Sequence, residues 1–315
     1  MRKLRIVFMG TPDFAVASLA ALVENNYTVV GVITSPDRPA GRGRSLRQSA
    51  VKNYAVEQGL KLLQPTNLKD TDFLDELTSL KANLQVVVAF RMLPKAVWAM
   101  PEYGTFNLHA SLLPDYRGAA PINWAIINGE TKTGVTTFFI DEKIDTGAII
   151  QQSECEIKET DNAGSLHDRL MLLGADLVLS TVRLIAENTV ETYNQKDLRT
   201  IHPAPKLTRE NSRIQWDQSL KSIYDHIRGL SPYPAAWTNL INGEEEIYIK
   251  VYSAVYIKEE HTYKPGKVLN AKSSIRIAVR DGFIDMEEIQ LPGKRKMSAR
   301  EVLNGLKLKD NAHVV

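Results

Sequence analysis

The sequence predicts an α/β protein in which a doubly wound, mainly parallel sheet is followed by a small β-barrel. Up to about residue 200, short apolar runs alternate with segments of helical periodicity. Several of these runs are almost entirely apolar, which is typical of parallel strands buried on both faces. Beyond that point, strand-like runs are joined by Asn-Gly, Pro-Gly and Asp-Gly turns, a pattern that indicates an antiparallel barrel. A chain of 315 residues suits two such domains.

The chain opens with a predicted strand, tight turn and helix. Residues 4–9 form a run that is apolar apart from Arg5, and residues 10–14 read as the turn. Apolar residues then recur at helical spacing (Ala15, Leu19, Leu22 and Val23). This arrangement is Rossmann-like, but Pro12 stands where the second glycine of Gly-x-Gly-x-x-Gly has to admit a pyrophosphate. We therefore expect no dinucleotide cofactor.

The other elements of the first domain follow the same alternation. We predict strands over residues 28–34, 60–63, 84–90, 105–108, 135–140 and 148–157, and helices over residues 51–58, 68–80 and 166–185. The first domain then covers residues 1–200, and a linker with two prolines covers residues 201–210.

The second domain, residues 211–315, begins with a helix predicted from the spacing of its apolar residues (Leu220, Ile223, Ile227 and Leu230). Strands are predicted over residues 238–241, 247–257, 274–278 and 283–289. We expect a short helical hairpin followed by an OB-like barrel.

The composition restricts the class of protein. The formal net charge is +2, and the basic excess lies in residues 206–315, which hold 18 Lys and Arg against 14 Asp and Glu. This distribution fits a solvated surface or a polyanionic partner. Cys155 is the single cysteine, so neither an intrachain disulfide nor a Cys-based metal site can form, and we expect no metal. No apolar run reaches the ~18 residues of a membrane span. We expect a cytoplasmic monomer without membrane contact.

The candidate catalytic residues lie in two segments. Asn107 and His109 are two residues apart on a predicted strand, so their side chains share one side of it. Asp145 follows the strand at residues 135–140 and could supply a carboxylate that orients the imidazole and stabilises its protonated form. Taken singly, a histidine at a strand end is more often structural, and an asparagine near a turn is often a cap. The three residues together favour catalysis.

Four short motifs here resemble those of the folate-dependent formyltransferases: Asn107-Leu108-His109, Ser111-Leu112-Leu113-Pro114, residues 117–122 and residues 144–147. The resemblance implies that Asn107, His109 and Asp145 form the catalytic trio and that 10-formyltetrahydrofolate is the co-substrate. It also implies that a second set of residues lies against the tetrahydrofolate: Ser111, Leu112, Leu113 and Pro114.

An arginine-rich segment, residues 35–48, separates the second strand from the following helix. It carries four arginines and one acidic residue and is longer than most such connections. Its composition fits a solvated loop and an RNA-binding loop equally well. The resemblance implies contact with the acceptor end of tRNA, because family members that act on aminoacyl-tRNA carry such an insertion. The expected tRNA-binding residues are Arg38, Gly41, Arg42, Gly43 and Arg44.

The resemblance extends through the second domain. Residues 206–216 and 227–237 are similar to the C-terminal domain of the family, which implies a tRNA-binding role for the predicted barrel. There are departures from the family pattern. Asn83 and Gln215 occupy positions where an acid is usual, and Phe90-Arg91-Met92 replaces a Tyr-Gly pair, which we expect to alter the folate pocket.

The expected reaction transfers the formyl group of 10-formyltetrahydrofolate to the amino group of methionyl initiator tRNA, which gives N-formylmethionyl-tRNA for translation initiation. Asn107 and His109 would stabilise the developing oxyanion, and Asp145 would hold His109 cationic and pass the amine proton to water. Formyl transfer to a sugar nucleotide or glycinamide ribonucleotide, or hydrolysis of formyl-folate, would use the same trio. Two alternatives come from other classes: a tRNA-binding protein without catalysis, and a dinucleotide-dependent oxidoreductase, which Pro12 disfavours.

Overall fold

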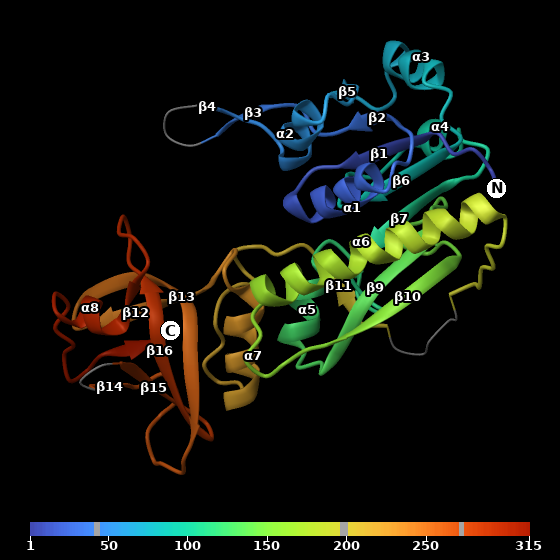
Figure 1. The fold of residues 1–315 in the computed structure, drawn as a ribbon. Coiled ribbons are helices and arrows are strands. Elements are labelled where there is room, and N and C mark those ends of the chain that lie inside the picture. Colours follow the sequence, from blue (N-terminus) through green and yellow to red (C-terminus); the bar gives the residue numbers. More distant parts are fainter. Residues whose placement is uncertain (41–44, 196–200, 271–273) are drawn as a thin grey trace. The chain divides into compact units, whose positions relative to one another are not determined.

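The computed structural model describes residues 1–40, 45–195, 201–270 and 274–315 (Figure 1). The chain divides into two compact units. The first comprises Met1–Gly118, Gly134–Cys155 and His167–Pro203, and the second comprises Ala119–Thr133, Glu156–Leu166 and Ala204–Val315. The second unit therefore includes two segments that precede residue 200.

The first unit is built on a seven-stranded sheet in the order β10-β9-β7-β6-β1-β2-β5. The strands are β1 (Ile6–Gly10), β2 (Val29–Ile33), β5 (Leu62–Leu63), β6 (Leu84–Val88), β7 (Thr105–His109), β9 (Lys132–Phe139) and β10 (Ile149–Glu156). Neighbouring strands from β7 to β5 are parallel, whereas β9 is antiparallel to β7. The predicted α/β class with a mainly parallel sheet is confirmed. A separate ladder joins β8 (Arg117–Gly118) and β11 (Pro203–Ala204).

Helices cover both faces of this sheet (Figure 1). They are α1 (Asp13–Glu24), α2 (Ala50–Glu57), α3 (Thr71–Ser79), α4 (Lys95–Trp98) and α6 (Ala163–Glu187). On one face Gly174 of α6 lies so close to β7 that an added Cβ would be 2.7 Å from the side chain of Leu108. On the other face, a core cluster that includes Val87 and Val97 packs α3 and α4 against the sheet. β1 and β6 are buried along their whole length, which explains why β1 is apolar throughout and β6 is apolar except at Gln85.

The arginine-rich segment contains a two-stranded ribbon. Strands β3 (Arg38–Ala40) and β4 (Ser45–Arg47) pair antiparallel, so part of the predicted loop over residues 35–48 is regular structure. The base of the ribbon is fixed by Asp37, whose carboxylate accepts hydrogen bonds from Lys52 Nζ at 2.5 Å and Gln64 Nε2 at 2.9 Å. A segment rich in Pro, Gly and Arg has low strand propensity, so periodicity does not reveal this ribbon.

The second unit contains an antiparallel sheet in the order β14-β15-β16-β13-β12-β18, and β17 pairs with β16. Its strands are β12 (Ala236–Asn242), β13 (Glu245–Lys258), β14 (Val268–Asn270), β15 (Ile275–Val279), β16 (Gly282–Gln290), β17 (Met297–Ser298) and β18 (His313–Val314). The predicted Asn242-Gly243 and Asp281-Gly282 turns join β12 to β13 and β15 to β16. The predicted barrel-like second domain is confirmed.

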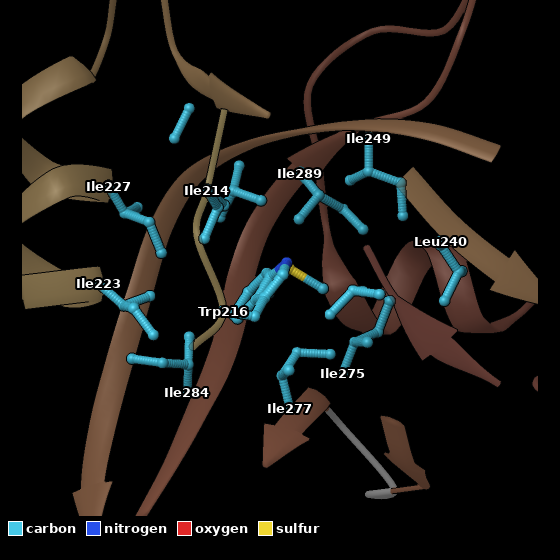
Figure 2. Close-up of a cluster of buried hydrophobic side chains, with 14 of the residues drawn as sticks. Ile214, Trp216, Ile223, Ile227, Leu240, Ile249, Ile275, Ile277, Ile284 and Ile289 are labelled. Carbon is cyan, nitrogen blue, oxygen red and sulfur yellow. The ribbon is translucent and has the colours of Figure 1, made fainter. Parts of the chain in front are cut away.

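One buried core joins helix α7 (Leu220–Leu230) to the strands of the second unit. Figure 2 shows Ile223 of α7 facing Ile284 of β16, with Trp216 at the centre of the cluster. Trp216 Nε1 donates a hydrogen bond to Thr238 Oγ1 at 2.9 Å. The polar group of this indole is therefore satisfied inside the core.

The predicted helical hairpin before the barrel is wrong, because a single helix, α7, precedes the barrel strands. Its neighbour is α5 (Pro121–Ile127), an earlier helix that the sequence reasoning does not identify. Asn123 Nδ2 donates to Gly229 O at 2.7 Å, and a Cβ at residue 229 would lie 2.6 Å from Ile127 Cγ1. Gly229 therefore lets the two helices approach closely. Helix α8 (Ala299–Leu303) is too short to be predicted from periodicity. Within the described ranges, no helix has the length and hydropathy that a membrane span requires.

Candidate active site

Strand β7 presents two of the predicted catalytic residues on one face of the sheet. Leu108 points toward α6, so its neighbours Asn107 and His109 point toward the opposite face, which carries α3 and α4. His109 ends the strand and is 6% exposed, whereas Asn107 is half-buried. The strand therefore places an amide and an imidazole side by side, with the imidazole the more deeply enclosed.

The imidazole of His109 is oriented by a backbone group. Its Nε2 lies 2.8 Å from the carbonyl oxygen of Tyr116, and because a carbonyl can only accept, Nε2 carries the hydrogen of this bond. Tyr116 has a positive φ of 59°, and its N–H donates to the carbonyl of His202 at 2.7 Å. The carbonyl of Tyr116 thus fixes the tautomer of His109, and Nδ1 is the nitrogen left for chemistry.

Asp145 lies beside Nδ1 of His109 without a direct hydrogen bond. The distance from Nδ1 to Asp145 Oδ2 is 3.9 Å, which exceeds a hydrogen bond but allows strong attraction to a protonated ring. The same carboxylate oxygen accepts a hydrogen bond from the backbone N–H of Gly118 at 3.0 Å. Asp145 is therefore held as a charge next to the imidazole, while the ring orientation comes from Tyr116.

The loop that carries Asp145 begins far from His109. Strand β9 runs antiparallel to β7, and its last residue, Phe139, pairs with Phe106 near the start of β7. The loop must therefore run back along β7 before Asp145 reaches the histidine. Asp145 has a positive φ of 55°, and a Cβ at residue 147 would lie 1.7 Å from the carbonyl oxygen of Phe139. Gly147 is thus required by the close approach of this loop to the end of β9.

The amide of Asn107 is a donor without an internal partner. Within the part of the chain that the structure describes, its side chain makes no hydrogen bond, and it is not enclosed. A half-buried amide in this position is available to a carbonyl oxygen of a substrate. A cavity of ≈ 600 Å³ borders the loop that carries Asp145, although no member of the trio lines it. Its lining consists of Arg117, Asp141, Glu142, Lys143, Thr146 and Gln195. The described residues contain no cluster of His, Cys, Asp or Glu that could hold a metal ion.

The predicted folate stretch, residues 111–114, is tied into the sheet. Ser111 and Leu113 are buried, whereas Leu112 and Pro114 are half-buried. Thr136 Oγ1 donates to Ser111 O at 2.6 Å and accepts from Leu113 N at 3.1 Å. Thr136 therefore ties the backbone of the stretch to β9, while the side chains of Leu112 and Pro114 are half-buried.

The structure describes one of the predicted tRNA-binding residues, Arg38. The other four lie outside the described residues: Gly41, Arg42, Gly43 and Arg44. Arg38 is exposed and stands directly opposite Arg47 in the β3–β4 register. The pKa of Asp37 is lowered, first by its hydrogen bond with Lys52 and then by that with Gln64, so this carboxylate is already engaged. No acidic side chain of the described ranges forms an ion pair with Arg38 or Arg47.

Three residues that the sequence reasoning does not select complete the geometry. Tyr116 and Gly118 act through their backbone carbonyl and N–H, and Gln195 is hydrogen-bonded to the Asp145 loop. Backbone groups leave no signature in the type of a residue, so chemistry-based selection passes over them. The signal that could have found Tyr116 and Gly118 is their position, because both lie in the short connection that follows the Asn107 and His109 strand.

Comparisons with known proteins identify the family of this chain. The family model described as formyl transferase matches residues 4–182, and the model described as formyl transferase, C-terminal domain, matches residues 206–307. A methionyl-tRNA formyltransferase from Flavobacterium johnsoniae is 59% identical over 314 residues, which cover 100% of both chains. A methionyl-tRNA formyltransferase from Bacteroides thetaiotaomicron is 54% identical over 312 residues, 98% of this chain and 97% of the relative.

Solved structures share the fold at lower sequence identity. The sugar 3N-formyl transferase WlaRD aligns with a TM-score of 0.66 at 22% identity, over 94% of this chain and 100% of that one. HypX from Aquifex aeolicus, in complex with tetrahydrofolic acid, aligns with a TM-score of 0.66 at 20% identity, over 98% of this chain and 49% of HypX. By the match of both family models and of its full-length relatives, the chain belongs to the formyl transferase family.

Proposed function

We propose that this protein transfers the formyl group of 10-formyltetrahydrofolate to the amino group of methionyl initiator tRNA, as a monomer in the cytoplasm. The observation that carries the proposal is the identity of 59% and 54% to methionyl-tRNA formyltransferases over nearly the whole chain. The sugar formyltransferase, at 22% identity, supports the fold alone. The arrangement of Asn107, His109 and Asp145 supports the same chemistry independently of the names.

The surroundings of the trio fit the flat ring system of a tetrahydrofolate. Met92, in the segment after β6, and Ile144, which precedes Asp145, are 69% and 60% exposed, which is high for large apolar side chains. An ion pair of 2.8 Å between Lys95 Nζ and Glu142 Oε1 links the two segments that carry them. These side chains, with those of residues 112 and 114, would hold the ring. When bound, 10-formyltetrahydrofolate supplies a formyl group on a nitrogen atom that can leave.

The trio acts on the oxygen of that formyl group. The amide of Asn107 donates to this oxygen as negative charge develops, and one such preorganised donor contributes about 3 kcal/mol of transition-state stabilisation. In the protonated ring of His109, the hydrogen on Nδ1 is not taken by Asp145, because 3.9 Å separates the two atoms. This hydrogen can point at the same oxygen while the carboxylate stabilises the imidazolium.

Formyl transfer also requires proton transfer, because one carbon–nitrogen bond forms while another breaks. The amine of the methionyl ester forms a bond to the formyl carbon, and the bond from this carbon to the donor nitrogen breaks. Asp145 accepts the amine proton through a water molecule and returns a proton to the leaving nitrogen in the same way. Gly118 N–H holds one carboxylate oxygen, at 3.0 Å, and leaves the other for this exchange.

The β3–β4 ribbon supplies a site for the tRNA backbone. Arg38 and Arg47 are directly opposed across the ribbon, and like charges in this position destabilise a strand pair. A phosphate between the two guanidinium groups would remove the repulsion and gain charge-assisted hydrogen bonds. We propose that Arg38 and Arg47 act with Gly41, Arg42, Gly43 and Arg44 as the tRNA contact, and that the barrel of the second unit adds further phosphate contacts.

The decisive experiment offers the protein several amine acceptors in parallel. Radiolabelled formyl-folate is incubated with methionyl initiator tRNA, with an amino-sugar nucleotide and with glycinamide ribonucleotide, and a sample without acceptor measures hydrolysis. We expect formylated product with the tRNA alone. Transfer to either small amine with a kcat/KM comparable to that for the tRNA would overturn the assignment of the tRNA as substrate. Release of formate without acceptor would overturn the assignment of the protein as a transferase.

A further inference from the structure

Gln195 is bound to the catalytic loop from a position 50 residues later in the chain. Its Nε2 donates hydrogen bonds to the carbonyl oxygens of Asp145 and Gly147, both at 2.9 Å. Its Oε1 accepts hydrogen bonds from Nε and Nη2 of Arg117, at 3.0 and 2.5 Å. The side-chain amide of Gln195 therefore joins two loops of the candidate active site, and both its nitrogen and its oxygen are engaged in these hydrogen bonds.

The pattern of donors and acceptors specifies an amide. The two carbonyl groups of the Asp145 loop can only accept, and the guanidinium of Arg117 can only donate. A glutamate at this position would satisfy Arg117 but would direct an oxygen at two carbonyl oxygens. A lysine would donate to the carbonyls but would lack an acceptor for Arg117. Among side chains of this length, glutamine alone meets both requirements.

The loop needs this support at Asp145 itself. Asp141 also braces the loop, because its carboxylate accepts hydrogen bonds from the N–H of Lys143 at 2.9 Å and from Thr146 Oγ1 at 2.8 Å. Asp145 then adopts a left-handed backbone with φ of 55°, a conformation that costs roughly 1 kcal/mol or more for a residue other than glycine. Apart from Gln195, the hydrogen bond that the structure gives Asp145 uses the carboxylate itself, through Gly118 N–H.

We propose that Gln195 is a positioning residue for formyl transfer. It holds the backbone of Asp145 so that the carboxylate stays 3.9 Å from Nδ1 of His109, near enough to stabilise the imidazolium and too far to take its hydrogen. Gln195 acts through Asp145 and does not touch the reacting atoms. This inference rests on the proposed function, because it assigns Gln195 a part in that reaction.

Gln152 offers a matched control within the same unit. Its Nε2 donates to Leu113 O at 3.0 Å and to Thr136 Oγ1 at 2.9 Å, and its Oε1 accepts from Tyr193 OH at 3.0 Å. This amide joins loop and strand in the same manner, but it holds the predicted folate stretch and has no bond to the Asp145 loop. A general loss of packing should affect Gln152 and Gln195 variants alike, whereas a positioning role should separate them.

The test compares Gln195→Glu, Gln195→Met and Gln152→Glu with the wild-type protein, with kcat and both KM values measured from pH 5 to pH 8. Displacing a catalytic group slightly costs on the order of 10²-fold in rate. We expect Gln195→Glu to lower kcat ~10- to 100-fold at pH 8 with both KM values within about two-fold. Its deficit relative to wild type should shrink toward pH 5, because a protonated glutamate regains a donor, whereas the deficit of Gln195→Met should not. Gln152→Glu should raise the KM for folate and leave kcat near wild type.

A second measurement does not depend on the substrate. The ring nitrogens of His109 are followed by NMR in the absence of any acceptor, and we expect the Nδ1 signal to move in Gln195→Glu and to stay in place in Gln152→Glu. An unmoved Nδ1 signal, a pH-independent deficit in Gln195→Glu, or equal kcat losses in the Gln195 and Gln152 variants would overturn the positioning role. If wild type fails to formylate the tRNA while the Nδ1 signal still responds to Gln195→Glu, the proposed substrate fails and the positioning role stands.

Discussion

Two histidines, one in each unit, show how surroundings decide whether an imidazole can react. His109 is bonded to a carbonyl through Nε2 and faces the carboxylate of Asp145 through Nδ1. His226, on α7, has a buried Nε2 without a hydrogen-bond partner among the described residues. Burial lowers the pKa of His226, against the smaller opposing effect of hydrogen bonds with the backbone of Ser212 and Arg213. A positive charge on the ring of His109 would be stabilised by Asp145, whereas burial favours the neutral ring of His226.

The surroundings of His226 contrast with those of His109 in charge. The cavity beside His226 has a volume of ≈ 150 Å³ and no described carboxylate lines it; its lining consists of Ile127, Ile214, Gln215, Gln218, Ser222, Ile223 and His226. Without an opposite charge, an enclosed imidazole loses its cationic form and with it the ability to stabilise an oxyanion. Enclosure is therefore not the property that makes His109 a catalytic candidate; the facing carboxylate is.

The largest effect should come from removing the reactive ring. His109→Ala removes one of two oxyanion donors and the charge next to Asp145, so we expect kcat for formyl transfer to fall ~10³-fold or more, with both KM values within a few-fold. Steady-state kinetics with formyl-folate and methionyl-tRNA measure this. His226→Gln is the matched control and should keep full activity. Equal losses in the two variants would show that histidine replacement merely disturbs folding.

The next effect isolates the carboxylate. Asp145→Asn keeps the size of the side chain and can still accept from Gly118 N–H, but it removes the negative charge beside Nδ1. We expect kcat to fall ~10²-fold, less than for His109→Ala, because the ring and its donor remain. In the double variant the two losses should not add, since the charge matters through the ring. Additive losses, measured in a double-mutant cycle, would mean that Asp145 acts independently of His109.

A smaller effect should follow from moving the loop without changing any catalytic group. Gly147→Ala places a Cβ against the carbonyl oxygen of Phe139, so the loop must shift away from β9. We expect kcat to fall ~10-fold through displacement of Asp145, with the protein still folded. Gly305→Ala is the control, because the nearest atom to its added Cβ lies at 3.9 Å. Wild-type kinetics for Gly147→Ala would mean that the loop relaxes without moving Asp145.

The smallest effect concerns His226 and appears in stability rather than activity. Because folding lowers the pKa of His226, the unfolded state binds its proton more readily than the folded state. The free energy of unfolding should therefore be fully retained above the unfolded pKa of ~6.5 and should decline as the pH falls below it, by at most ~1.4 kcal/mol per pH unit from this residue.

The matched variant for this prediction is His226→Gln, which removes the titrating group. Denaturant unfolding of both proteins between pH 5 and pH 8 should give a difference in unfolding free energy that grows below pH ~6.5, with the wild type losing more. Parallel curves for the two proteins across this range would contradict the neutral, buried state of His226.

Much of the fold could be predicted because the local pattern of apolar residues matches the burial of the same residues in the folded protein. The run that became β1 is apolar throughout and the run that became β6 is apolar except at Gln85, since both faces of those strands are covered. The pairing of Asn107 with His109 followed from strand periodicity alone. By contrast, the ribbon at β3 and β4 has turn-like composition, and α5 is a short helix that begins at Pro121. Both depend on contacts elsewhere in the chain rather than on local propensity.

For the candidate site, the sequence allowed a prediction of which residues take part but not of how they are arranged in space. That Asp145 approaches His109 depends on β9 being antiparallel to β7 and on a loop that runs back along the strand, neither of which leaves a periodic signal. The tautomer of His109 depends on the backbone carbonyl of Tyr116, and the loop depends on Gln195, a single polar side chain after a long helix. Interactions over such separations emerge only from the folded chain.

The packing of α5 on α7 bears on how this protein can be recombined with its relatives. α5 lies in the chain between β7 and β9, yet it belongs to the second unit, where Gly229 leaves room for Ile127 and its carbonyl accepts from Asn123. A chimera that takes only residues 204–315 from another family member would set a foreign α7 against the native α5. Crossover sites placed around residues 118 and 133 as well would transfer the matched helices together. The segments that must be exchanged together are therefore separated in the gene, although α5 and α7 form one packed pair in the protein.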